Sequence, residues 1–180
     1  MTAKECILGR RSIRQYSDKT VDETVLREIV EEASYAPSWK HTQITRYIAV
    51  TDPAVKNRIA KEGTTIWPGN GRIIEQAPVL VAVTAIKGRS GFERDGSYST
   101  VCEDRWEFFD TGIASQTFCL AAYEHGLGTV ILGLFDVDTI STILNLPEDR
   151  ELIALIPLGY PAEEPTAPKR KSVDDLLTII

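Results

Sequence analysis

Residues 78–86 read PVLVAVTAI, an almost unbroken run of apolar residues that is rich in valine. The length and composition of the run predict a β-strand. The lack of alternation with polar residues predicts that both faces of this strand are covered. We therefore expect it to lie inside a sheet that has helices packed around it.

The segments on either side supply the other elements of such a domain. Helical patterns follow candidate N-cap residues, and several of them end at or near a glycine. We expect helices at residues 2–9, 22–36, 52–63, 101–125 and 136–146, and a short capped helix after Ser172. We expect further strands at residues 46–50, 129–134 and 152–160.

Two segments are predicted to lack regular structure. Residues 64–76 have Pro-Gly-Asn-Gly at their centre, which is typical of a loop. Residues 87–99 are polar and glycine-rich, which indicates a mobile surface segment.

Helices and strands interleave and no linker divides the chain, so residues 1–180 are expected to form a single α/β or α+β domain.

The composition limits the classes of partner. With a net charge of −6, the chain is not expected to bind nucleic acid or an anionic membrane through a global charge attraction. Its three cysteines have no metal-site spacing, which disfavours a zinc site or a disulfide framework and favours the cytoplasm. The N-terminus lacks a signal-peptide pattern, and no segment approaches the roughly 18 apolar residues of a transmembrane helix.

Arginines nevertheless cluster near the start of the chain. Arg10, Arg11 and Arg14 surround Ser12 in the sequence GRRSIRQ. A guanidinium group can bind a phosphate or a carboxylate through two hydrogen bonds, and a serine hydroxyl adds a further donor. The cluster therefore suits a phosphate monoester, and the alternative is a solvated basic loop.

A second basic group lies near the other end of the chain. Lys169 and Arg170 are either part of an exposed tail or part of the same anion site. The two common nucleotide-binding motifs are missing: there is no G-x-x-x-x-G-K-[ST] sequence, and GNG at residues 69–71 lacks the context of G-x-G-x-x-G. A P-loop enzyme and a dinucleotide-binding Rossmann domain are therefore disfavoured.

Several segments, taken in order, resemble the FMN-dependent nitroreductase family. They are RRSIRQYSDKTV, APSWKHTQ, EQAPVLVAV, DTGIASQTFCLAAYEHGLGT, VILGLFD and LIPLGYPAEEP, and together they extend over nearly the whole chain. The resemblance implies an α+β, nitroreductase-like fold with a central, mostly antiparallel sheet surrounded by helices. It also implies a homodimer that binds FMN at the interface with residues of both chains.

The resemblance implies a role for each basic residue. Arg10 and Ser12 would bind the FMN phosphate, and Arg170, next to Lys169, would close on it from the C-terminal side. Arg14 would reach the pyrimidine end of the flavin ring, where a permanent cation stabilises the anionic reduced form and raises its potential. Arg11 matches a less constant position, at which the backbone is expected to matter more than the side chain.

The stretch VILGLFD is similar to the family segment whose backbone amide meets flavin N5. Glycine at position 133 would let the chain approach the ring closely, although a simple turn after a strand also explains it. The expected contact residues here are Ile131, Leu132 and Gly133. Asn70 resembles a flavin-contacting asparagine in the loop before the apolar strand.

APSWKHTQ is similar to a family segment that contacts the flavin from the partner chain. Pro37 and Ser38 match it, whereas His41 stands where the family often has Asn. A histidine can donate to the same ring oxygen, or it can face solvent. Trp39 could cover the ring or the dimer seam, or it could be a core or interface aromatic, and Gln43 ends the motif.

We therefore expect an oxidoreductase that uses NAD(P)H and FMN to reduce a nitroaromatic, a quinone or a similar acceptor. Both substrates would use one site in turn, which gives ping-pong kinetics. The flavin carries the chemistry, so no catalytic side chain and no metal is expected. The alternatives are a flavin store or redox sensor with little turnover, and a different flavin reaction such as dehalogenation.

Overall fold

Strand β2 (Val79–Ile86) lies in the middle of the sheet, and seven of its eight residues are buried. It pairs antiparallel with β1 (Thr45–Val50) on one side and with β4 (Arg150–Gly159) on the other. The short strand β3 (Gly128–Thr129) pairs antiparallel with β4, so that the order is β1-β2-β4-β3. The expectation of a mostly antiparallel sheet is confirmed in this computed structural model, which describes residues 1–180.

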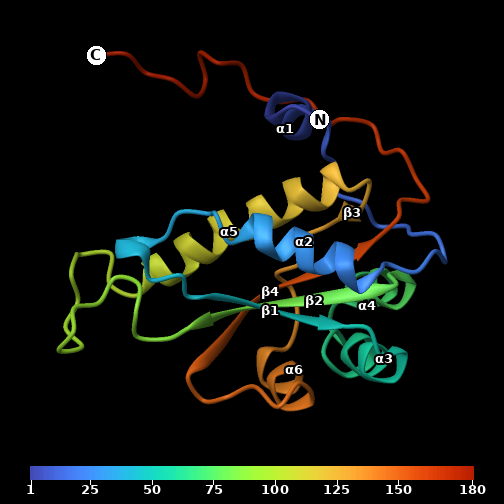
Figure 1. Ribbon diagram of the computed structural model, residues 1–180, viewed down its shortest axis with the longest axis horizontal. Helices are drawn as coiled ribbons and strands as arrows, with labels where there is room; N and C mark the ends of the chain where they lie inside the picture. Colours follow the sequence, from blue (N-terminus) through green and yellow to red (C-terminus); the bar gives the residue numbers. More distant parts are fainter.

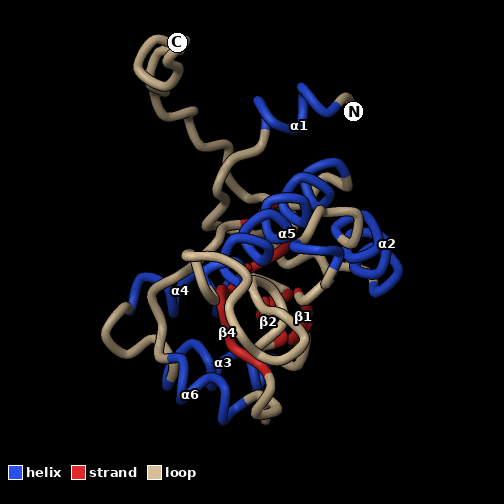
Figure 2. Tube along the Cα trace, turned by 90° about the vertical axis from the view of Figure 1, so that its left-hand side faces the viewer, coloured by secondary structure: helices blue, strands red, loops and turns tan.

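Helices cover both faces of the sheet (Figures 1 and 2). One face carries α2 (Glu23–Ala33) and α5 (Arg105–Glu124), and the other carries α3 (Pro53–Glu62), α4 (Pro68–Gln76) and α6 (Val137–Ile143). Alternate residues of β2 enter the two cores, because successive side chains of a strand point to opposite faces. Val81 packs with Ile29 and Phe118, whereas Leu80 packs with Ile59 and Ile74.

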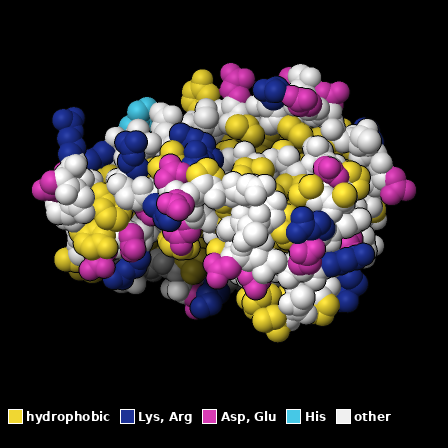
Figure 3. Space-filling model, turned by 90° about the horizontal axis from the view of Figure 1, so that it is seen from below, with side chains coloured by type: hydrophobic (Ala, Val, Ile, Leu, Met, Phe, Trp, Pro, Cys, Tyr) yellow, Lys and Arg dark blue, Asp and Glu magenta, His cyan; other side chains and the backbone are white.

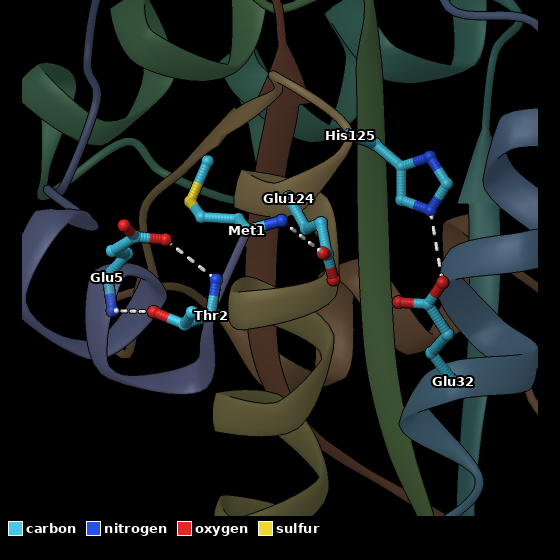
Figure 4. Close-up of polar contacts among 6 residues, drawn as sticks. All are labelled: Met1, Thr2, Glu5, Glu32, Glu124 and His125. Atoms are coloured by element: carbon cyan, nitrogen blue, oxygen red, sulfur yellow. Dashed lines mark hydrogen bonds and ion pairs between the residues drawn. The ribbon is translucent and has the colours of Figure 1, made fainter.

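Four of the predicted helix starts are confirmed by their capping hydrogen bonds. The carboxylates of Asp22, Asp52 and Asp136 accept from backbone N–H groups of α2, α3 and α6. Thr2 and Glu5 form a reciprocal capping box at the start of α1 (Ala3–Gly9) (Figure 4). These bonds satisfy N–H groups that have no partner within the helix, so the caps fix where each helix begins.

The two chain ends lie at one side of the molecule (Figure 1). The terminal ammonium of Met1 is 3.1 Å from the carboxylate of Glu124, at the last residue of α5 (Figure 4). His125 follows at the helix end, where its Nε2 is 3.2 Å from Glu32 on α2.

The expected loop at residues 64–76 is wrong, because residues 68–76 form helix α4. Pro68 occupies the first turn, where a missing N–H costs nothing. Gly71 lies against α3 so closely that an added Cβ would be 2.8 Å from the carbonyl oxygen of Ala60. The glycines that suggested a loop therefore include one that is required for contact between two helices.

Three other element predictions need correction. The strand expected at 129–134 is reduced to β3 and a single bridge between Leu132 and Leu155. The long helix begins at Arg105 rather than at residue 101. The helix expected after Ser172 is only a turn, although Asp175 makes the expected capping bonds with Ser172.

Residues 87–99 have more internal structure than a mobile surface segment. The N–H of Glu93 donates to the carbonyl of Ser97 at 2.8 Å, and the rings of Phe92 and Tyr98 lie 4.9 Å apart. We call residues 91–99 the hairpin. Ser90, at its base, is completely buried.

The surface carries charges of both signs. On the face drawn in Figure 3, basic and acidic side chains are interspersed rather than separated into large patches. A cluster of charges of one sign therefore calls for a local explanation.

None of the helices combines the length and the apolar character that a membrane crossing requires.

Candidate functional site

The two basic groups of the sequence meet in the structure. A hollow of about 430 Å³ lies between the N-terminal arginine segment and the C-terminal tail. We call it the arginine hollow, and its lining residues are Arg10, Arg11, Ser12, Arg14, Pro165, Thr166, Pro168 and Arg170. Lys169 does not line it. No carboxylate is in the lining, so its donor set fits a phosphate group.

Backbone pairing places this hollow at the edge of the sheet. The N–H of Ile13 donates to the carbonyl of Thr129 on β3 at 3.0 Å, and Ser12 forms a parallel bridge with Thr129. The tail returns beside the same segment, because the N–H of Ala162 donates to the carbonyl of Gln15 at 3.0 Å. Glu163 accepts from the backbone N–H of Arg14 at 2.6 Å, which leaves the Arg14 side chain outside that contact.

The three arginines of the N-terminal segment have different surroundings. Nη1 of Arg11 donates to the carbonyls of Leu8, Gly9 and Arg10 at 2.7, 3.1 and 2.9 Å. These carbonyls lie at the end of α1, so this guanidinium caps the helix. Arg14 makes one long contact of 3.4 Å with the carbonyl of Ser12. Arg10 lines the hollow without a salt bridge.

The APSWKHTQ segment lines a second hollow, of about 320 Å³, between α2, β1 and α5. Pro37, Ser38 and Gln43 line it, whereas Trp39 and His41 do not. Ser38 Oγ accepts from the backbone N–H of Gln43 at 2.9 Å and so closes the turn. We call residues 38–43 the Ser38 turn, and the cavity beside it the turn hollow.

The Ser38 turn has an uncommon backbone. Lys40, His41 and Gln43 have positive φ values of 43°, 58° and 48°. Residues with side chains adopt this left-handed region at a cost, and such residues concentrate at functional sites. The side chains of His41 and Gln43 are exposed, and the Gln43 amide nitrogen is 2.6 Å from His41 Nε2.

Trp39 is held by α5 rather than lying free over a ligand. Its ring centroid is 4.7 Å from that of Trp106, and its backbone N–H donates to Asp110 at 2.8 Å. Phe108 and Phe109, also on α5, are more than half exposed. Core packing is therefore not their role within one chain.

Asn70 and residues 131–133 are neighbours. The Asn70 side-chain amide donates to the carbonyl of Leu134 at 2.9 Å, so it holds the segment that carries Gly133. Leu132 is buried and both of its backbone groups bond to Leu155, whereas Ile131 is about half exposed. A Cβ added at Gly133 would meet no atom within 4 Å. The space beside Gly133 is therefore open in this chain.

Two buried residues near the turn hollow were not predicted from the sequence to have a role at the site. Asp110 and Ser90 join the Ser38 turn to the base of the hairpin. An acidic residue in the apolar stretch FFDTGIAS is the only signal that could have pointed to Asp110.

Burial raises the pKa of Glu107, one turn earlier on α5, while the backbone N–H groups of Arg89 and Gly88 lower it.

The arginine hollow and the turn hollow share no lining residue and are separate on the single chain. The turn hollow adjoins α2 through Val30 and Ala33, whereas no residue of α2 lines the arginine hollow. Tyr47 lies between α2 and α5, where its hydroxyl donates to the carbonyl of Ala114 at 3.2 Å, and burial raises the pKa of this phenol. Tyr47 therefore stays neutral.

A comparison with family models decides the family. The model of the Nitroreductase family matches residues 7–160. The chain belongs to the nitroreductase family. It is therefore an oxidoreductase of that family, and the expected α+β nitroreductase fold is confirmed.

Individual nitroreductase relatives agree with this assignment. The chain is 31% identical to an NADH dehydrogenase of Thermus thermophilus, over 91% of this chain and 89% of that protein. It is 26% identical to iodotyrosine deiodinase 1 of Homo sapiens, over 98% of this chain and 68% of that protein. The names of these relatives differ, so the family alone does not fix the acceptor.

Solved nitroreductase structures match the fold over nearly the whole chain. A nitroreductase family protein from Streptococcus pneumoniae superposes with a TM-score of 0.86 at 20% identity, covering 99% of this chain and all of that chain. An FMN-dependent nitroreductase from Clostridium difficile superposes with a TM-score of 0.78 at 25% identity and covers 98% of both chains.

Proposed function

We propose that this chain binds FMN and uses NAD(P)H to reduce a nitroaromatic, a quinone or a similar acceptor. The observation that carries the proposal is the arginine hollow, which gathers Arg10, Ser12, Arg14 and Arg170 from both chain ends without a carboxylate in its lining. Bound FMN would supply the hydride-transfer chemistry. The matching FMN-dependent nitroreductase from Clostridium difficile supports this choice of ligand.

The residues of the chain would bind and orient the flavin. Arg10, Ser12 and Arg170 would hold the phosphate, and Arg14 would place a permanent cation near the ring, where it stabilises negative charge. The open space beside Gly133 leaves room for a planar ring to approach the main chain. Because no side chain is assigned a proton transfer, we name no catalytic residue.

We further propose a homodimer in which the Ser38 turn of one chain meets the arginine hollow of the other. The separation of the two hollows on a single chain supports this arrangement. Helix α5 is suited to an interface, because its outer side carries Phe108 and Phe109, which are 52% and 58% exposed. Two neighbouring exposed aromatic side chains form an apolar patch that a second chain could cover.

Steady-state kinetics test the proposed reaction. With FMN-loaded protein, NADH or NADPH oxidation should depend on a nitroaromatic or quinone acceptor, and double-reciprocal lines should be parallel, as in a ping-pong mechanism. Flavin binding without turnover would instead favour the store or sensor. If a halogenated phenol is the only acceptor that supports NAD(P)H oxidation, dehalogenation would be favoured.

The three free cysteines agree with the proposed cytoplasmic location.

A further inference from the structure

Asp110 is a buried carboxylate that the proposed hydride chemistry does not use. It lies on α5, is 3% exposed, and belongs to the lining of the turn hollow. One of its oxygens, Oδ2, accepts from the backbone N–H of Trp39 at 2.8 Å and from the hydroxyl of Ser90 at 2.5 Å. A carboxylate is costly to bury unless such donors satisfy it, so these bonds are integral to its placement.

The two donors belong to segments that are far apart in the sequence. Trp39 is the second residue of the Ser38 turn, and Ser90 lies at the base of the hairpin. One oxygen atom therefore holds both segments to α5. The ring of Trp39 also contacts the ring of Trp106 on α5 at a tilted angle of 46°, which holds the same turn through a second contact.

The Ser38 turn needs such support because of its backbone. Three of its residues, Lys40, His41 and Gln43, are in the left-handed region. A strained conformation persists only where the surrounding structure holds it. Within the turn, the bond from the Gln43 N–H to Ser38 Oγ closes the loop, but it does not attach the turn to the rest of the molecule.

A second link between the turn and the hairpin is weaker. Lys40 Nζ is 2.7 Å from a carboxylate oxygen of Glu93, but these side chains are 54% and 49% exposed. Exposed ion pairs contribute little because water and salt screen them. The hydrogen bonds of Asp110 are charge-assisted and shielded from water, so Asp110 is the stronger of the two attachments.

We propose that Asp110 is a positioning residue of the flavin site. Through Trp39 and Ser90 it keeps the Ser38 turn in the conformation that exposes His41 and Gln43, the residues expected to meet the flavin of the partner chain. The role of the turn in flavin binding rests on the proposed function. The attachment of the turn to α5 does not rest on it.

The test compares Asp110→Asn with Glu93→Gln in the full-length protein. The amide keeps the size of the side chain but removes the charge that strengthens both bonds, so exchange of the backbone amides of residues 39–43 should become faster. The dissociation constant of FMN should rise about tenfold, because loss of the charge weakens both hydrogen bonds that hold the turn. The Glu93→Gln control should change it less than about fivefold.

Each result supports or overturns the inference. Unchanged amide exchange at residues 39–43 in Asp110→Asn would overturn the attachment, and faster exchange with unchanged FMN affinity would overturn the positioning role. If Asp110→Asn does not fold, Ser90→Ala removes one donor without the charge and should shift both measurements in the same direction. An unsubstituted protein that fails to bind FMN would contradict the proposed function itself, which separates the two failures.

Discussion

Arg10 and Arg11 are adjacent in the sequence, but only one of them has a guanidinium group available for a ligand. Arg11 caps α1 with three backbone contacts, whereas Arg10 lines the arginine hollow without a salt bridge. The residue pattern alone predicted a cluster, and only the resemblance to the family set Arg11 apart from Arg10. Their difference depends on where α1 ends relative to the hollow.

Substitution of the two arginines should therefore give opposite results. Arg10→Ala should weaken FMN binding by about tenfold or more, because one charge-assisted contact to phosphate is lost. Arg11→Ala should change FMN affinity little and lower the free energy of unfolding by about 1 kcal/mol, because the hydrogen bonds to the carbonyls at the end of α1 are lost. Titration of FMN fluorescence and urea unfolding measure the two effects. Equal loss of affinity in both variants would contradict this assignment.

Gly133 offers a test in which folding and binding are separated. No protein atom lies within 4 Å of an added Cβ, so Gly133→Ala should leave the unliganded protein as stable as before or about 0.5 kcal/mol more stable. If the flavin approaches the main chain there, the added methyl group should weaken FMN binding. Thermal unfolding without FMN and FMN titration are the measurements. Lower stability would contradict the open space beside Gly133, and unchanged FMN affinity would show that the flavin does not approach the main chain there.

Helix α4 shows why some elements were predicted and others were not. The helices that begin at Asp22, Asp52 and Asp136 carry their start signals in the local sequence, and their caps form as expected. In α4, Gly69 and Gly71 have low helix propensity, and the helix depends on contact with α3. Likewise, the apolar run after β3 is irregular, because Leu132 alone pairs with Leu155.

The two glycines of α4 provide a matched pair of substitutions. Gly71→Ala should lower the free energy of unfolding by about 1–3 kcal/mol, because a Cβ would be 2.6 Å from Thr64 Oγ1 and 2.8 Å from the Ala60 carbonyl. Gly69→Ala meets only the end of Arg72, at 3.9 Å, and should raise it by up to about 1 kcal/mol. Urea unfolding at one protein concentration measures both. Equal effects would contradict the close contact of α3 and α4.

In the whole molecule the expected flavin contacts fall mainly into three regions: the arginine hollow, the Ser38 turn beside the turn hollow, and the neighbouring Asn70 and residues 131–133. The resemblance to the family predicted these residues, and the structure places Arg10 and Arg170 in the lining of one hollow. The sequence could not predict Asp110 or Ser90, since their role arises from segments that meet only after folding. The sheet explains the assembly of the arginine hollow, because β3 orients the Arg10–Arg14 segment.

Mixed dimers test whether the two hollows act in trans. One chain would carry Arg10→Ala with Ser12→Ala, and the other would carry Asp110→Asn. If each site uses the arginine hollow of one chain and the Ser38 turn of the other, half of the sites in the mixed dimer are intact. NAD(P)H oxidation should then return to about half of the unsubstituted rate, from much lower values in either variant alone. No recovery on mixing would indicate that both hollows serve the same chain.

The most direct test of the central claim is the visible absorption spectrum of the purified protein with added FMN, recorded after gel filtration and again after anaerobic addition of NADH or NADPH. We predict that the flavin band stays with the protein and is bleached by at least one nucleotide. The same protein with Arg10→Ala and Ser12→Ala should lose the band on the column. A protein that elutes without flavin, or that retains a flavin which neither nucleotide bleaches, would contradict the claim that this chain is an NAD(P)H-dependent flavoenzyme.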